Sequence, residues 1–135
     1  INLNIIHLHD ERDYVFSKSS LSQALVFYNY RFEDKGIFTI LDSDDAPAFT
    51  ILNGKNPGIF SESIKSNDIA LVLDPQNLTN PIESFELFIE VSQIIQETFQ
   101  CQILDEDRNF MTKQMIEHMK NQFHEYQRQF LASAS

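Results

Sequence analysis

The stretch DKGIFTILDSDDAPAFTILN, residues 34–53, decides the fold class of this chain. Residues 34–41 and 48–53 are both rich in Ile, Phe, Thr and Leu, and residues 42–47 between them are rich in Asp, Ser and Pro. Short runs of such apolar and β-branched residues are typical of strands, and Asp, Ser and Pro are typical of turns. The stretch therefore predicts a β-hairpin, and with it an antiparallel sheet.

Further strands are predicted on both sides of this hairpin. Residues 1–8 mix Ile and Leu with Asn in rough alternation and predict a first strand. The apolar run at residues 69–73, ended by Asp74 and Pro75, is typical of a central strand. Residues 101–104 and 109–111 predict a small second hairpin around residues 105–108. Together these segments predict an antiparallel sheet of about six strands.

Three helices are predicted by apolar residues at helical spacing. Their stripes are Leu21, Ala24, Leu25 and Tyr28, then Phe85, Phe88, Ser92, Ile95 and Phe99, then Met115, Met119, Phe123, Tyr126 and Phe130. The first helix follows serine caps within residues 17–20 and stops at Asn29. The second begins at Asn80 with Pro81 in its first position, and Thr112 caps the third. Residues 131–135 are expected to fray.

The two faces of the predicted sheet differ, because strand side chains alternate between them. One face collects large residues, namely Phe38, Ile40, Phe49, Ile51, Ile69, Leu71 and Leu73. We expect the three helices on that side, which makes the fold class α+β. The other face collects Lys35, Ile37, Ala48, Thr50, Leu52, Gly54, Ala70, Val72 and Asp74, together with Leu3 and Ile5. Such an uncovered face marks an interaction site, unless a loop or an oligomer covers it.

Length, charge and cysteine content limit the possible classes of function. The chain is predicted to form one domain over residues 1–135. Twenty acidic residues against ten basic ones give a net charge of -10, which repels nucleic acid and anionic lipids and favours a neutral or basic partner. The single cysteine, Cys101, suits a reducing compartment. No run reaches the roughly 20 apolar residues of a membrane span, and the start at Ile1 indicates an excised domain.

His7 and His9 form the best metal-like grouping in the sequence. Both point to one side of the first strand, with Asp10 and Glu11 adjacent. The grouping lacks a remote third ligand, and zinc sites normally show a clearer spacing. It is interpreted as structural, so no metal is predicted.

Other candidate chemistry is equally weak. A calcium loop counted from Asp42 would have Pro47 where a glycine is needed and Asn53 where a carboxylate is needed. The acidic residues 105–107 are interpreted as a solvated turn. The sequence has no nucleophile elbow, phosphate loop or dinucleotide fingerprint, and Cys101 has no histidine nearby in sequence. Neither catalysis nor a cofactor is predicted.

Several stretches, in this order along the chain, carry a resemblance to a known family. They are LSQAL at residues 21–25, RFEDKGIF at 31–38, residues 49–60 ending in NPGIF, and ILDEDRNFMT at 103–112. Over nearly the whole chain they resemble the C-terminal domain of the ZipA family. The resemblance implies an α+β domain of split β-α-β type with three helices on one face of an antiparallel sheet. It also implies a shallow hydrophobic groove on the open face, which binds the C-terminal tail of FtsZ, the tubulin-like protein of the bacterial division ring.

The resemblance also implies which residues form this groove. Its floor would consist of Leu3, Ile5, Lys35, Ile37, Leu52, Gly54, Ala70 and Val72, with Asn56 and Arg108 at its rim. The family often has Met in place of Lys35 and Gly54, and Phe in place of Val72, so a smaller and less apolar groove is expected. The family's membrane-spanning N-terminus and linker would precede this chain and tether the division ring to the inner membrane, with this domain on the cytoplasmic side at the division site.

Two alternatives remain at this point. One is a nucleic-acid-binding sheet of RRM-like architecture, which would use the same open face. The net charge of -10 and the small residues where stacking aromatics would be needed both oppose it. The other is an enzyme whose distant groups converge only in the folded chain.

Overall fold

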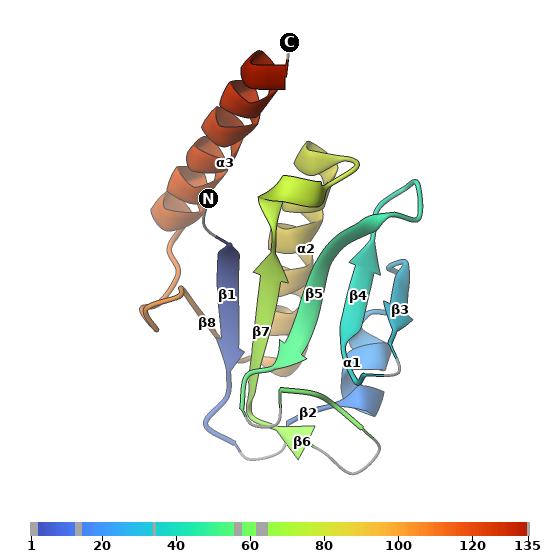
Figure 1. Cartoon of the computed structure of the whole chain (residues 1–135). Coiled ribbons are helices and arrows are strands. Elements are labelled where there is room, and N and C mark those ends of the chain that lie inside the picture. The colour runs from blue at the N-terminus through green and yellow to red at the C-terminus, as the bar shows by residue number, and fades with distance from the viewer. Residues whose placement is uncertain (1–2, 13–14, 34, 56–57, 62–64, 135) are drawn as a thin grey trace.

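The computed structural model describes residues 3–12, 15–33, 35–55, 58–61 and 65–134, without the side chains of Tyr126 and residues 130–134. A six-stranded sheet with the order β3-β4-β5-β7-β1-β8 forms its centre (Figure 1). The strands in this order are β3 (Tyr30–Phe32), β4 (Phe38–Leu41), β5 (Pro47–Asn53), β7 (Asp68–Leu73), β1 (Asn4–His9) and β8 (Gln102–Leu104). All neighbouring pairs are antiparallel, which confirms the predicted antiparallel sheet. The strand predicted over residues 109–111 is wrong, because only Phe110 pairs there, in an isolated bridge to Leu104. A separate two-stranded sheet, β2 (Phe16–Ser17) with β6 (Lys65–Ser66), was not predicted.

The predicted helices are present as α1 (Lys18–Ala24), α2 (Pro81–Phe99) and α3 (Lys113–Ala134). Ser17 caps α1 through a capping box with Ser20, and Pro81 occupies the first turn of α2. A short 3-10 helix, η1 (Pro75–Asn77), joins β7 to α2. Helix α1 ends before the predicted stop at Asn29, because the chain continues there as turns.

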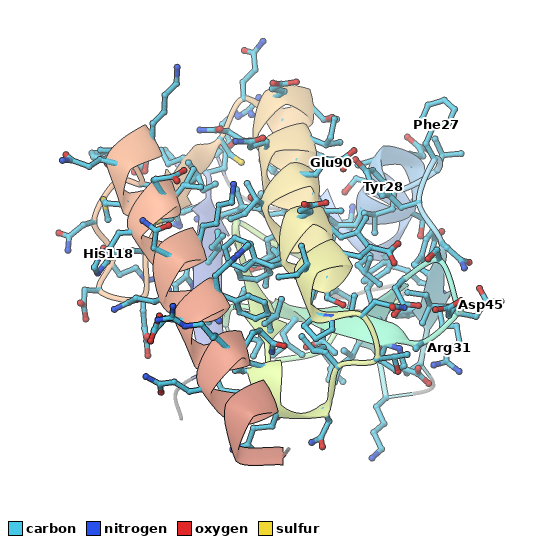
Figure 2. The ribbon with its side chains drawn as sticks, turned by 90° about the horizontal axis from the view of Figure 1, so that it is seen from above. Phe27, Tyr28, Arg31, Asp45, Glu90 and His118 are labelled. Carbon is cyan, nitrogen blue, oxygen red and sulfur yellow. The ribbon has the colours of Figure 1, made fainter. Side chains whose placement is uncertain are left out.

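A tyrosine in these turns ties the end of α1 to α2. The Tyr28 hydroxyl donates a hydrogen bond to Glu90 Oε1 at 2.8 Å, and the two side chains lie together in Figure 2. Burial and the Glu90 carboxylate raise the pKa of Tyr28 to about 12. Phe27, the preceding residue, points outward and is 95% exposed.

The core lies between the sheet and α2, which covers the rear face of the sheet in Figure 1. The large strand residues predicted for the helix side are all buried there, namely Phe38, Ile40, Phe49, Ile51, Ile69, Leu71 and Leu73. Phe49 packs edge-on against Phe88 of α2, with ring centroids 5.4 Å apart. The alternation of the strands therefore predicted correctly which face is covered.

Helix α3 reaches the core through α2 rather than through the sheet. Its Phe123 is 3% exposed and stacks on Phe85 of α2, with ring centroids 5.0 Å apart. In Figure 1, α3 runs beside the β1 edge of the sheet. Of the predicted buried stripe, Met115 and Met119 are half-buried, whereas the side chains of Tyr126 and Phe130 lie outside the described part of the structure.

The strand predicted over residues 34–41 is shorter than expected. It begins only at Phe38, and β3 at Tyr30–Phe32 was missed. Between them the chain turns, with the Glu33 amide donating to the Ile37 carbonyl and Gly36 at a φ of 84°. Gly36 also lies so close to the Phe60 backbone that a side chain would not fit. Lys35 therefore belongs to a turn and not to a strand.

The acidic stretch between β4 and β5 organises the predicted hairpin. Asp42 is buried and accepts hydrogen bonds from the amides of Asp44 and Ala46. Its second oxygen accepts from the side chain of Asn80, at the start of α2. This network satisfies the Asp42 carboxylate within the turn, so the residue has a structural role that sequence spacing did not indicate.

Candidate peptide-binding face

The face of the sheet opposite α2, here called the open face, carries two rows of side chains in register. Thr50, Val72 and Ile5 are direct cross-strand neighbours and form the first row. Leu52, Ala70 and His7 form the second row, which continues to Leu104 of β8. The sheet is seen from this side in Figure 1. Aliphatic side chains, together with Thr50 and His7, thus form a continuous floor across β5, β7 and β1.

A hollow of about 340 Å³ lies at one end of this floor. It is lined by the first row through Thr50 and Val72, by Leu3 from the segment before β1, and by Asn77 and Leu78 from the η1 region. Leu3 is 45% exposed and Val72 is half-buried, so apolar surface faces solvent here. This end of the open face can bury an apolar side chain of a ligand.

A polar cluster closes the other end of the open face. Asp68, at the start of β7, is 1% exposed. Arg108 donates to both oxygens of its carboxylate, and His9 Nδ1 lies 2.9 Å from Oδ2. His7 Nδ1 is buried, lies 3.7 Å from Asp68 Oδ1 and has no hydrogen-bond partner. Gly54 follows β5 directly, and the Asp68 carboxylate occupies the space that a side chain on Gly54 would need.

The Asp68 carboxylate is ionised in this setting. Burial by itself would raise its pKa, but the polar groups of His7, Arg108 and His9 outweigh burial and lower its pKa to about 2. Because Arg108 pairs with it across β1, the charge is largely compensated. The cluster therefore gives the open face a fixed polar boundary next to its apolar floor.

The structure brings most of the predicted groove residues together. Ile5, Leu52, Ala70 and Val72 lie side by side on the open face. Ile37 is half-buried and comes directly before β4, whose register with β5 begins at Phe38 and Ile51.

The remaining predicted residues lie around this floor. Leu3 lines the hollow, Gly54 adjoins Asp68, and Arg108 reaches back to Asp68 from the turn after β8. Lys35 is exposed in the β3–β4 turn. Asn56 lies outside the described residues.

Several residues of this face were missed as site residues. They are Thr50, His7, His9, Asp68, Leu104 and Phe110, the last of which pairs with Leu104 and is 64% exposed. The parity of the strands could have placed Asp68 there, since residues 68, 70 and 72 share one face. No sequence pattern pairs Asp68 with Arg108, because that contact depends on the path of β8.

Two observations on the described residues concern the histidine pair and the cysteine. Although His7, His9 and Asp68 converge, no group of three or more side chains that could hold a metal ion is present among the described residues. Burial raises the pKa of Cys101 to about 11, so its thiol stays protonated near neutral pH. None of the described helices combines the length and apolarity needed to span a membrane.

An α+β domain with a bare, partly apolar sheet face beside a hollow is typical of a protein-binding domain. Comparison with known proteins identifies the family. Residues 2–122 match the family described as "ZipA, C-terminal FtsZ-binding domain", and the chain belongs to this family of cell-division proteins.

Individual relatives agree with this assignment. The chain is 30% identical over 84 residues to the cell division protein ZipA of Colwellia psychrerythraea, covering 59% of this chain and 22% of that protein. It is 26% identical over 102 residues to ZipA of Marinobacter nauticus, covering 70% and 30% of the two chains. For ZipA of Azotobacter vinelandii the identity is 24% over 123 residues, covering 86% and 43%. The matched part is less than half the length of each of these relatives.

Proposed function

We propose that this domain is a non-catalytic adaptor that binds the C-terminal tail of FtsZ on its open face. The observation that carries the proposal is the row Thr50–Val72–Ile5 beside the hollow at Leu3, an apolar surface that no described helix covers. Membership of a family described by FtsZ binding supports the choice of partner.

In this proposal the tail lies across β5, β7 and β1 and buries a few apolar side chains. The hollow at Val72 and Leu3 takes one of them, and the shallower floor at Leu52 and Ala70 takes another. The Asp68–Arg108 pair bounds the floor and favours a polar residue of the tail at that end. Because the floor is small and the tail must become ordered, binding is expected to be weak.

Lys35, Ile37 and Asn56 extend the proposed site toward the β3–β4 side of the sheet. Ile37 is half-buried beside the Leu52 row and offers apolar contact, whereas exposed Lys35 offers a charge. Asn56 is assigned to the rim by the family resemblance alone. The edge of the site at these residues is therefore expected to contribute less than its floor.

A peptide is a better ligand than a nucleic acid for this face. Leu52, Ala70 and Val72 at the centre of the described floor are aliphatic and do not stack on bases. The net charge of -10 repels a phosphate backbone. The same charge steers basic residues of a peptide toward the domain.

The cellular role proposed with this binding is to hold the division ring at the inner membrane. The tether would be a membrane-anchored segment in another part of the whole protein, since the curated relatives are far longer than this chain. The domain would then work on the cytoplasmic side of the inner membrane at the division site.

Titration of the ¹⁵N-labelled domain with a synthetic FtsZ tail peptide tests the site. The amides of Ile5, Leu52 and Val72 are expected to shift saturably. Val72→Asp should weaken binding at least about tenfold, because it places a charge in the apolar floor, while the domain stays folded. The matched control is Val26→Asp, since Val26 is 66% exposed and lies after α1, away from this face. If the peptide shifts another surface, or if both variants bind equally well, the assignment is wrong.

A further inference from the structure

The edge of β1 is only half covered by β8. β8 pairs with His7, Leu8 and His9 and then leaves the sheet. It leaves because the Asp105 amide donates to the Asn109 carbonyl, and because Arg108 takes a left-handed conformation with a φ of 69°. In the described part of the chain, no strand pairs with β1 on this edge before His7.

The backbone of Ile5 points toward this uncovered edge. The Met111 amide donates to the Ile103 carbonyl, and the Asp105 amide donates to the Asn109 carbonyl. Residues 103 and 105 therefore direct their backbone groups toward the segment 109–111 and away from β1. Leu104 must then direct its groups toward its partner His7. Since backbone groups alternate along a strand, Ile5 directs its N–H and C=O to the same edge as His7. An edge of this kind is a template for an added strand.

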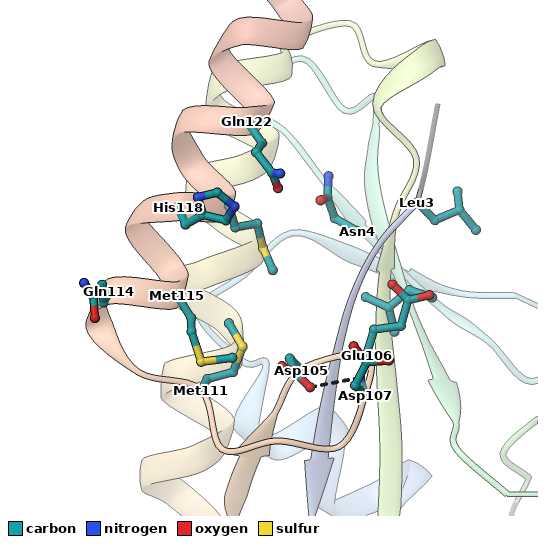
Figure 3. A pocket seen from close by; sticks show the side chains of 12 residues that line it. Leu3, Asn4, Asp105, Glu106, Asp107, Met111, Gln114, Met115, His118 and Gln122 are labelled. Atoms are coloured by element: carbon teal, nitrogen blue, oxygen red, sulfur yellow. Dashed lines mark hydrogen bonds between the residues drawn. The ribbon is translucent and has the colours of Figure 1, made fainter.

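A groove of about 590 Å³ runs between this edge and α3 (Figure 3). Met111, Met115 and Met119 line it from the α3 side, and these are all the methionines of the chain. In Figure 3, Met111 and Met115 project into the space between α3 and the 105–107 turn. Methionine side chains are flexible and polarisable, so they adapt to different apolar ligands. A strand added at Ile5 would place every second side chain against them.

The charge of the groove selects the kind of segment that fits. Glu106 and Asp107 are exposed at its lower end, and neither Lys nor Arg is among the described residues that line it. Asp105 is engaged in its own turn, where it accepts from the amide of Asp107. A second copy of this chain would bring a further charge of -10 and the same acidic rim. Charge complementarity therefore favours a basic partner over self-association.

We propose that this groove docks an extended basic segment of a partner protein, which adds to the sheet as a strand beside β1. The Ile5 backbone groups pair with the segment, the three methionines contact its apolar side chains, and Glu106 and Asp107 bind its Lys or Arg side chains. The site shares Leu3 and Ile5 with the open face but differs from it, because it uses the strand edge and the α3 side of β1. It does not depend on the proposed binding of FtsZ.

Capped hexapeptides provide a direct probe of this groove. A peptide of alternating Lys and Val should shift the Ile5 amide and the methyl groups of Met115 and Met119 saturably, and it should slow hydrogen exchange of the Ile5 amide. A peptide of alternating Glu and Val, and one with three Lys followed by three Val, should bind at least about tenfold more weakly. Equal binding of the three peptides would overturn the proposal, as would shifts confined to Leu52 and Val72 of the open face.

Comparison of two double charge-reversal variants distinguishes docking in the groove from unspecific attraction of a basic peptide to an acidic domain. Glu106→Lys combined with Asp107→Lys should weaken the Lys/Val peptide about tenfold. Glu86→Lys combined with Glu97→Lys changes the net charge equally on exposed positions of α2 and should leave binding within about twofold. Equal loss in both double variants would contradict a site at the groove. Sedimentation that shows the free chain to dimerise through this edge would also overturn the proposal.

Discussion

Gly54 and Asp68 lie so close together that a Cβ atom on Gly54 would come within 2.0 Å of Asp68 Oδ1. The Gly54 amide also donates to the Asp68 carbonyl at 2.8 Å. The absence of a side chain at position 54 thus makes room for a buried carboxylate on the open face. The buried charged cluster therefore adjoins the apolar floor at this end. In the proposed mode of binding, the tail is consequently expected to use the part of the floor near Val72 and Leu3.

Gly54→Ala should destabilise the domain by about 1–3 kcal/mol, because its Cβ atom would collide with the Asp68 carboxylate. In an Asp68→Ala background the same change should cost less, since the oxygen 2.0 Å away is gone and of the close Asp68 atoms only the backbone carbon, 3.1 Å from the Cβ position, remains. Urea unfolding of the four proteins measures this coupling. Gly58→Ala is the control, because Gly58 has a φ of 80° but no neighbour near its Cβ position. Its effect should not depend on Asp68, and additive effects of Gly54→Ala and Asp68→Ala would refute the contact.

The stability of the domain should depend on the ionisation of Asp68 in acid. Its pKa is lowered from 3.8 to about 2 by folding, so the ionised group stabilises the folded state above its unfolded pKa. This contribution, about 2 kcal/mol, is lost as the pH falls from about 4 through about 2. Asp68→Asn should therefore be less stable than the parent near neutral pH and approach it in acid. Glu106→Gln, at an exposed carboxylate, should show no such convergence.

Arg108→Ala should destabilise the domain by about 2 kcal/mol, because it leaves the Asp68 carboxylate buried without its cation. The pKa of Asp68 should rise in the variant, which a carboxyl-carbon NMR titration measures. Arg31→Ala is the matched control, since Arg31 and Glu33 form an exposed pair 3.8 Å apart. That change should alter stability by less than about 0.5 kcal/mol. An unchanged Asp68 titration in Arg108→Ala would refute the pairing.

Phe123→Ala should cost about 3 kcal/mol, because it removes the buried ring that joins α3 to Phe85. The amides of α3 should lose protection from hydrogen exchange before those of β5 and β7 do. Phe27→Ala removes a ring that is 95% exposed and should change stability by less than about 0.5 kcal/mol. Uniform loss of protection across the sheet in Phe123→Ala would show that α3 unfolds with the whole domain.

The regular elements were predictable because their signals are local. Short apolar runs bounded by turn residues identified β5 and β7, and helical spacing after Asn80 identified α2. β3 and its turn into β4 were missed, and the strand predicted over residues 34–41 was too long, since this turn depends on Gly36 lying against the backbone of Phe60. That contact joins residues 24 positions apart in sequence, and no local pattern reports it.

The floor of the candidate site was also predictable from local sequence patterns. Strand parity brought Ile5, Leu52 and Val72 onto one face, and the structure has them in register there. The polar boundary was not predicted. Asp68 and Arg108 come from β7 and from the turn after β8, and only the pairing of both with β1 brings them together.

The sequence by itself determined the α+β class, the covered and uncovered faces of the sheet and the absence of a local catalytic motif, because periodicity and composition are properties of neighbouring residues. The tertiary structure alone decided three features of the candidate sites. It set where β8 leaves β1, which groups surround the Asp68 carboxylate, and how α3 forms a groove beside Ile5. These features depend on strand order and on contacts between distant segments, which the packing of the whole chain decides.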